Sequence, residues 1–339
     1  MIDFRSDTVT KPTAEMLAKM FAAKVGDDVF GDDPSIIELE QYAAQLFGKK
    51  AALFCSSGTQ TNQIAIKAHT QPGDELICDR LAHIYNYEGG GIAFNSGVQV
   101  RYVFGERGIF TADDILQNIN ADDPHFPKTS LVCIENTVNK GGGSYWSLEQ
   151  MKSIKNVCDE KKLKLHLDGA RLFNALVETN ISTLEIGETF NSISICLSKG
   201  LGCPIGSLLI GDEDFIYQSK RIRKILGGGM RQAGYLAAAG LYALQNNIER
   251  LKDDHTKAKL IEKMLLSLNY VQEIIPVQTN IIIFKLKPEI NTPTLLQHLL
   301  NCNIKTVSSG AQTIRFVTHL DINMNDLNVL ESALQQFKH

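Results

Sequence analysis

One lysine of this sequence stands where its amine could attack a carbonyl group. Residues 192–197 alternate apolar with small or polar side chains, which is the period-two pattern of a strand. Lys199 follows in the glycine-punctuated loop 198–206, and a second apolar run covers residues 207–210. A lysine in a turn is ordinarily solvated. Here the apolar flanks favour a partly buried amine, and a desolvated lysine can act as a nucleophile.

Residues 56–59 (Ser-Ser-Gly-Thr) could bind an anion. They lie between an expected strand over 51–55 and an expected helix over 59–68. At such a junction the backbone N–H groups and the helix dipole favour an anion, and Ser57 and Thr59 add hydroxyl donors. The stretch matches neither the phosphate loop with Gly-Lys-Ser/Thr nor the GxGxxG fingerprint. Taken alone, it is more simply explained as a helix cap.

An acid ends another expected strand, over residues 163–167. Asp168 closes this strand and Arg171 follows; if a helix starts there, the two lie one turn apart on the same side. Helix capping would explain Asp168 and a salt bridge would explain Arg171. A carboxylate at a strand end can also keep a heterocyclic nitrogen protonated, as a pyridine cofactor requires.

Together these residues match the three anchors of pyridoxal 5′-phosphate. The helix N-terminus at 56–59 would hold the phosphate, Asp168 would pair with the ring nitrogen, and Lys199 would hold the aldehyde as a Schiff base. Each signal is weak alone, but the three in one chain predict a pyridoxal-phosphate enzyme.

Two further side chains, His83 and Arg315, could contact a cofactor or an amino-acid substrate. His83 follows an expected strand and could stack on a cofactor ring, although a lone histidine is more often structural. His125 has no local pattern that singles it out. Arg315 lies inside the apolar strand 313–317 and needs a buried anionic partner or a ligand. A substrate carboxylate would be its natural bidentate partner.

Short apolar strands alternate with helical patterns from residue 50 onward. The main expected strands cover residues 51–55, 75–79, 99–104, 130–135 and 163–167. Helices are expected from Pro12, from Asp33 to Gly48, from Ser147, over 212–226, and in two long runs to Ser267. This order predicts an α/β fold with a mostly parallel sheet covered by helices, whose ligands bind at the carboxyl ends of strands. We expect a large cofactor-binding domain over 1–245, with an N-terminal arm over 1–34, and a smaller C-terminal α/β domain over 246–339.

The composition argues against a nucleic-acid-binding, membrane-bound or disulfide-linked protein. The net charge of −4 over 339 residues gives no reason to expect nucleic acid or a membrane as partner. The seven cysteines include no CxxC pair, so we expect reduced thiols in an intracellular protein and no metal site. The N-terminal residues have no apolar core of a signal peptide, and no apolar run is long enough to span a bilayer.

Several blocks of the sequence resemble the threonine aldolases, most of all the low-specificity L-threonine aldolases of the aspartate-aminotransferase fold. The matching blocks are residues 3–12, 27–34, 167–171, 198–202 and 227–232. The resemblance covers essentially the whole chain. It implies retro-aldol cleavage of L-threonine or L-allo-threonine to glycine and acetaldehyde, in a cytoplasmic enzyme of threonine catabolism and glycine biosynthesis.

The resemblance also implies a role for each matching residue. The cofactor would be bound by Lys199, Asp168, Ser57, Gly58, Thr59, His83, Arg171, Lys224 and Arg231. The substrate carboxylate would be held by Ser6, Arg171 and Arg315, and His83 and His125 would lie near the substrate hydroxyl. The family forms homotetramers with sites at dimer interfaces, so Lys224 and Arg231 would come from a neighbouring subunit, and this would account for the acidic loop at 25–34.

The sequence departs from the family at two positions, and it leaves open the catalytic base and two alternative functions. Phe30 stands where members often carry tyrosine, and Val138 stands where they carry histidine. The catalytic base could be His83, His125 or a water, of which we favour a water ordered by both histidines. An aminotransferase or β-lyase is the alternative reaction and would be indicated by a keto acid in place of an aldehyde. The other alternative is a non-catalytic protein that binds a small molecule. In that case the Lys199→Ala variant would keep the affinity for the ligand.

Overall fold

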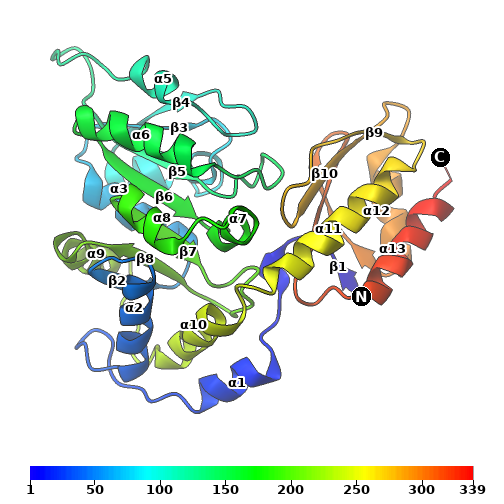
Figure 1. Cartoon of the computed structure of the whole chain (residues 1–339), viewed down its shortest axis with the longest axis horizontal. Helices are drawn as coiled ribbons and strands as arrows, with labels where there is room; N and C mark the ends of the chain where they lie inside the picture. The colour runs from blue at the N-terminus through cyan, green and yellow to red at the C-terminus, as the bar shows by residue number, and fades with distance from the viewer. Residues whose placement is uncertain (339) are drawn as a thin grey trace.

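The computed structural model of the chain describes residues 1–338 and contains a larger and a smaller sheet, each covered by helices (Figure 1). The larger sheet has the order β2-β8-β7-β6-β5-β3-β4. Its strands are β2 (Ala51–Cys55), β8 (Ser207–Gly211), β7 (Ser192–Cys196), β6 (Lys164–Gly169), β5 (Thr129–Glu135), β3 (Glu75–Asp79) and β4 (Gln99–Val103). β8 is antiparallel to both neighbours and the other adjacent pairs are parallel. The expected mostly parallel α/β sheet is confirmed.

Helices cover both faces of the larger sheet because successive side chains of a strand point to opposite faces. Ile193 and Ile195 of β7 join the large core, whereas Ser192 and Ser194 contact the helix on the other face. On the core side lie α1 (Ala14–Phe21), α2 (Pro34–Leu46), α6 (Leu148–Glu160), α7 (Leu172–Thr179), α8 (Thr183–Thr189) and α10 (Gly234–Asn246). On the other side lie α3 (Gly58–His69) and α9 (Glu213–Ile225). The polar positions of β7 therefore face α3, which carries the expected anion site.

Capping residues fix where the expected helices begin. Asp33 caps α2 and Ser147 forms the expected capping box of α6. The helix expected from Pro12 begins later, because the Thr13 side chain caps α1 and leaves Pro12 outside the helix.

The smaller sheet is antiparallel and packs its own core. Its order is β12 (Val307–Gly310), β13 (Thr313–Val317), β10 (Ile281–Leu286) and β9 (Val271–Ile274). Its helices are α11 (Leu251–Leu266), α12 (Thr292–Asn301) and α13 (Met324–Gln336). A smaller C-terminal α/β unit is thus present, and the domain boundary between residues 245 and 246 stays a prediction.

The N-terminal segment connects the two units. β1 (Ile2–Asp3) pairs in parallel with β11 (Ile304–Lys305), and Phe4 is fully buried in the core of the smaller unit. The chain then crosses to the larger unit, where α1 packs on α10. Figure 1 shows this course, with the blue segment running from the smaller unit toward α1. Residues 5–10 therefore pass between the two sheets.

Short turns complete the described chain: η1 (Asp7–Val9), α4 (His83–Asn86), the π-helical turn η2 (Ile92–Ser96) and α5 (Ala112–Leu116). Within residues 1–338, no helix has the length and apolar character needed to cross a membrane.

Candidate active site

The carboxyl ends of five strands of the larger sheet point toward the same edge. β3, β5, β6 and β7 are parallel, and β2 runs the same way because β8 is antiparallel to both β2 and β7. The polar residues that end or follow these strands are Ser57, His83, Glu135, Asp168 and Lys199. Ligands of open α/β sheets bind at such an edge.

Asp168 is buried near the end of β6, and both of its oxygens accept hydrogen bonds. Oδ2 accepts from Nδ2 of Asn62 at 3.0 Å and Oδ1 from the backbone N–H of Ala170 at 3.2 Å. The one-turn spacing that Asp168 and Arg171 would have in a shared helix is absent, because α7 begins only after Arg171. Asp168 and Arg171 therefore do not share a helical face, and each has its own partners.

The start of α3 leaves two backbone N–H groups without a helical partner. The Ser57 hydroxyl caps the helix by accepting from the Gln60 N–H at 3.2 Å. The N–H groups of Gly58 and Thr59 precede the first intrahelical bond and have no helical partner. A Cβ on Gly58 would lie 2.6 Å from the Cys196 Sγ, so only glycine lets the helix start approach β7 this closely.

His83 sits at the centre of a group of buried carboxylates. Its backbone N–H donates to Glu135 at 2.8 Å, and its Nδ1 lies 3.0 Å from Glu88. Ligand atoms of His83, Glu88 and Asp168 all lie within 4.8 Å of one another. The hydrogen bond to Glu88 raises the pKa of His83 against the effect of burial, and Asp168 adds to the rise. Burial, reinforced by Asp168, raises the pKa of Glu135 to about 7.

A buried ion pair from the N-terminal segment lies beside the lysine. Arg171 donates to the two oxygens of Asp7 at 2.8 and 2.7 Å, and Asn280 adds a bond to Asp7 at 3.2 Å. Burial acts to raise the pKa of Asp7, but the charge and hydrogen bonds of Arg171, with Lys199 nearby, lower it to about 2. Lys199 therefore lies near enough to this pair to act on Asp7. Nη1 of Arg171 has no hydrogen bond to residues 1–338.

Arg315 reaches the same place from β13 of the smaller sheet. Nη1 donates to Asn139 at 3.0 Å and Nη2 to the carbonyl of Arg5 at 2.9 Å, next to Ser6. Its Nε is buried and has no partner among the described residues. Burial and the neighbouring charge of Arg171 lower the pKa of Arg315. A buried, unpaired guanidinium N–H that also feels the charge of Arg171 calls for an anion.

These groups fit pyridoxal phosphate. The open helix start suits a phosphate, buried Asp168 suits a protonated ring nitrogen, and Lys199 suits the aldehyde carbon. The orphan Nε of Arg315 suits a carboxylate beside them. The structure brings together the predicted residues Ser6, Ser57, Gly58, His83, Asp168, Arg171, Lys199 and Arg315 around the edge of the larger sheet, with Thr59 on the first turn of α3.

His125 lies apart from this group. Its side chain is 86% exposed and bonds Asp123 at 2.7 Å, in the loop between α5 and β5. Within one chain it does not join the other predicted residues. Val138 stands at the position where the resembled family carries histidine. It is buried, and its backbone pairs with that of Ser144.

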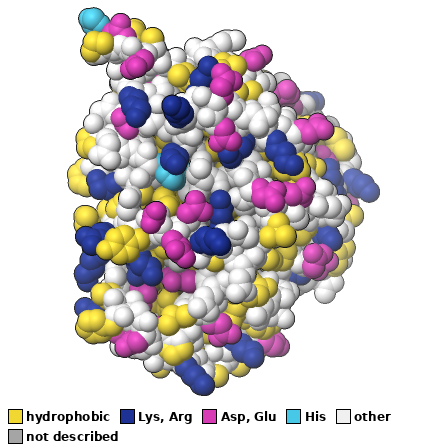
Figure 2. Space-filling view, turned by 60° about the vertical axis from the view of Figure 1, so that its left-hand side comes forward, with side chains coloured by type: hydrophobic (Ala, Val, Ile, Leu, Met, Phe, Trp, Pro, Cys, Tyr) yellow, Lys and Arg dark blue, Asp and Glu magenta, His cyan; other side chains and the backbone are white. Residues whose placement is uncertain are grey.

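Lys224 and Arg231 lie beside the acidic loop. Arg231 bonds Asp27 at 2.9 Å, and Lys224 lines a surface hollow with Phe30, whose side chain is largely exposed. On the face seen in Figure 2, basic and acidic side chains are interspersed with apolar ones, and neither sign forms a continuous patch. The loop is therefore held by its own chain and keeps an aromatic side chain exposed.

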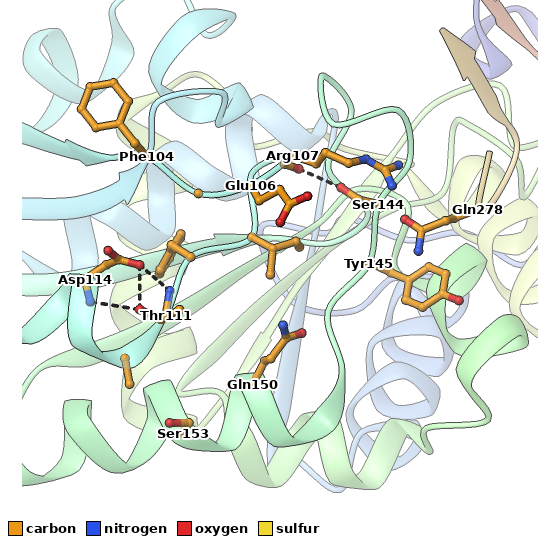
Figure 3. Close-up of a pocket in the computed structure, with 14 residues that line it drawn as sticks. Phe104, Glu106, Arg107, Thr111, Asp114, Ser144, Tyr145, Gln150, Ser153 and Gln278 are labelled. Atoms are coloured by element: carbon orange, nitrogen blue, oxygen red, sulfur yellow. Dashed lines mark hydrogen bonds between the residues drawn. The ribbon is translucent and has the colours of Figure 1, made fainter. Parts of the chain in front are cut away.

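A second hollow lies away from these residues (Figure 3). Its lining includes Glu106, Arg107, Tyr145, Gln150 and Gln278, and none of the predicted site residues. Arg107 donates there to the carbonyls of Gly141 and Pro276 at 2.8 and 2.9 Å, which ties loops of the two units together.

Sequence reasoning missed several buried residues of the site. Asp7, Asn62 and Glu88 read as ordinary polar residues of an arm, a helix and a turn. One signal was available for Asn62: the period of α3 places it on the same face as the buried residues Ala65 and Ile66.

Comparison with known proteins gives concordant findings. A family model described as "Beta-eliminating lyase" matches residues 3–288. The chain is 42% identical over 328 residues to the low specificity L-threonine aldolase of Escherichia coli (strain K12), covering 96% of each protein. It is 37% identical over 340 residues to the low specificity L-threonine aldolase of Saccharomyces cerevisiae, covering 98% of this chain and 86% of the relative.

Solved structures share the fold. A threonine aldolase of Leishmania major superposes with a TM-score of 0.86 at 21% identity, over 99% of each chain. A serine palmitoyltransferase of Sphingomonas wittichii superposes with a TM-score of 0.78 at 14% identity, over 98% of this chain and 86% of that one.

Proposed function

The chain belongs to the beta-eliminating lyase family, among the low-specificity L-threonine aldolases, and on that premise we propose that it cleaves L-threonine and L-allo-threonine to glycine and acetaldehyde. The enzyme is a carbon–carbon lyase that uses pyridoxal 5′-phosphate. One observation carries the proposal: the buried, unpartnered Nε of Arg315 lies among the groups that fit the cofactor. An amino-acid carboxylate would satisfy it.

Lys199, Asp168 and the start of α3 would hold the cofactor. Lys199 would bind its aldehyde carbon, Asp168 its ring nitrogen, and Ser57, Gly58 and Thr59 its phosphate. His83 would stack on the ring. When bound, the cofactor supplies an electron sink for the pair released from the Cα–Cβ bond.

Ser6, Arg171 and Arg315 would orient the substrate. Its carboxylate would accept from the Arg315 Nε, the free Nη1 of Arg171 and the Ser6 hydroxyl. Asp7 supports this role because its two bonds hold the guanidinium of Arg171 in one plane. A fixed carboxylate determines which bond of Cα is aligned for cleavage.

The β-hydroxyl proton would pass to a water ordered by His83 and by His125 of a second copy. Glu88 holds Nδ1 of His83, which leaves Nε2 for that water. His125 is exposed in its own chain, so its role requires another subunit. The Cα–Cβ bond then breaks, acetaldehyde leaves with its carbonyl formed, and a proton added at Cα gives glycine.

We also propose a homotetramer with sites at dimer interfaces, in the cytoplasm, serving threonine catabolism and glycine biosynthesis. The exposed Phe30 beside Lys224 and Arg231 supports a subunit contact at the acidic loop. The seven free cysteines support a reducing compartment. Sedimentation analysis would give the number of subunits.

The test is acetaldehyde release from L-threonine and L-allo-threonine by the purified protein, with Lys199→Ala as control. Release that is lost in Lys199→Ala is the expected result, and the ratio of the two rates gives the stereochemical preference. Keto acid in place of acetaldehyde would instead support the aminotransferase or β-lyase alternative.

A further inference from the structure

Buried polar side chains of α3, β6 and β7 form one hydrogen-bonded chain behind Asp168. Nε2 of His69 lies 2.7 Å from the Ser192 hydroxyl, which lies 2.8 Å from Nδ1 of His166. Nε2 of His166 lies 3.1 Å from Oδ1 of Asn62, and Nδ2 of Asn62 donates to Asp168 at 3.0 Å. His166 and Ser192 are fully buried, and Asn62 and Asp168 nearly so. The chain thus runs from the far end of α3 to the acid of the cofactor site.

The chemistry of the groups fixes the direction of every bond in this chain. Asp168 accepts, so the amide of Asn62 must turn its NH₂ toward it and its oxygen toward His166. Burial lowers the pKa of His166 to about 4, so the ring is neutral and donates from Nε2 alone. Nδ1 then accepts from the Ser192 hydroxyl, which in turn accepts from Nε2 of His69.

Asn62 also joins Asp168 to the group that holds His83. Its Nδ2 donates to Glu88 at 2.9 Å as well as to Asp168, and the same oxygen of Glu88 bonds Nδ1 of His83. One amide therefore spans two buried carboxylates that would otherwise repel each other. Gln63 satisfies the second oxygen of Glu88 at 2.8 Å.

We propose that Asn62 is a positioning residue that aims Asp168 at the ring nitrogen of the cofactor and Glu88 at His83, and that Ser192 and His166 hold its amide in the required orientation. This inference rests on the proposed cofactor site. Ser192 thereby has a role as the residue of β7 whose side chain joins this hydrogen-bonded chain under α3.

The test compares pyridoxal phosphate with its 1-deaza analogue, in which carbon replaces the ring nitrogen that Asp168 would contact. Dissociation constants are measured by titration of the apoenzyme, following the bound-cofactor absorbance or the fluorescence of the single tryptophan, Trp146. The wild type is expected to prefer the natural cofactor over the analogue. Asn62→Ala should reduce that preference about tenfold, the scale of one hydrogen bond to a charged group, with little change for the analogue.

Ser192→Ala interrupts the hydrogen-bonded chain at a residue that has no direct bond to Asp168. It should reduce the same preference in the same direction, and Ser192→Thr, which keeps the hydroxyl, should restore it. The matched control is Thr61→Val, which removes a buried 2.7 Å hydrogen bond to Ser194 between the same helix and strand. It should leave the preference unchanged.

If Asn62→Ala and Ser192→Ala weaken the binding of pyridoxal phosphate and of the analogue equally, the hydrogen-bonded side chains have a purely structural role and the inference is overturned. It is also overturned if neither variant changes the affinity for either ligand. Circular dichroism identifies a variant that does not fold, and the remaining variant then decides. A wild type that binds neither ligand would refute the proposed function instead.

Discussion

At the scale of single residues, removing one partner of the buried Asp7–Arg171 pair is expected to destabilise the fold. Asp7→Asn would leave the guanidinium of Arg171 without its carboxylate in a buried site. Removing one partner of a buried pair costs about 3–5 kcal/mol of the free energy of unfolding. Urea denaturation at neutral pH measures this loss. As control, Glu249→Gln breaks an exposed pair with Lys252 and should cost less than about 1 kcal/mol.

The same pair predicts a pH dependence. The pKa of Asp7 is lowered from 3.8 to about 2 in the folded chain, chiefly because Arg171 outweighs the effect of burial. The stabilisation is therefore complete above the unfolded pKa and is lost as the pH falls through the folded one. The difference in unfolding free energy between wild type and Asp7→Asn should shrink by about 2 kcal/mol between roughly pH 5 and pH 1. A difference that stays constant with pH would contradict this assignment.

A substitution at Arg315 is expected to weaken substrate binding and to leave cofactor binding unchanged. Arg315→Lys keeps a positive charge but removes the planar fork and the orphan Nε–H. The KM for L-threonine should rise roughly 10- to 100-fold, the value of a charge-assisted hydrogen bond. The absorbance of the bound cofactor should not change. Loss of that absorbance, or an unchanged KM, would remove Arg315 from the carboxylate site.

At the scale of elements, the start of α3 depends on one glycine. In Gly58→Ala the new Cβ would press on Cys196, which would push the helix start away from β7. Overpacking costs about 1–3 kcal/mol, and the affinity for pyridoxal phosphate should fall because the phosphate site moves. The double variant with Cys196→Ala frees the space and should recover most of the affinity. Failure of this recovery would mean that the helix start is not set by this contact.

The elements that the sequence predicted well are those with a clear period. The alternation in β7 located Lys199, and the capping box at Ser147 located α6. Asp168 and Arg171 share no helical face because β6 runs through Gly169, and Arg171 forms an ion pair with Asp7. The role of Asn62 was not predicted, because an asparagine is ordinarily exposed and this one is buried only through its bonds to Glu88 and Asp168.

At the scale of the whole molecule, the position of His125 predicts sites shared between subunits. If His125 serves a neighbouring site, Lys199→Ala and His125→Ala should complement each other in mixed dimers, since one site of each mixed dimer has both residues intact. Refolding the two inactive variants together should restore about a quarter of the wild-type activity, the random share of intact sites in a twofold assembly. No recovery would place both residues in one subunit's site or remove His125 from it.

The arrangement of the two units was beyond the reach of sequence patterns. Ile2 and Ile304 pair as neighbours in a sheet, and Arg315 contacts the carbonyl of Arg5, although some three hundred residues separate them. Period and capping report local structure, whereas such pairings depend on how distant segments pack. Hence most strands of the larger sheet could be expected, but not the path of the N-terminal segment between the two sheets.

That path has a consequence for synthesis on the ribosome. Residues 2–7 are translated early, yet the strand that pairs with them and the arginine beside Ser6 emerge only after nearly the whole chain has been made. Contacts of such sequence separation require the closure of a long loop and are slow to form. A nascent chain can thus assemble the lysine and the acid of the larger sheet before its carboxylate site exists. Amino-acid binding would begin only when the last strands of the smaller sheet close over the first residues.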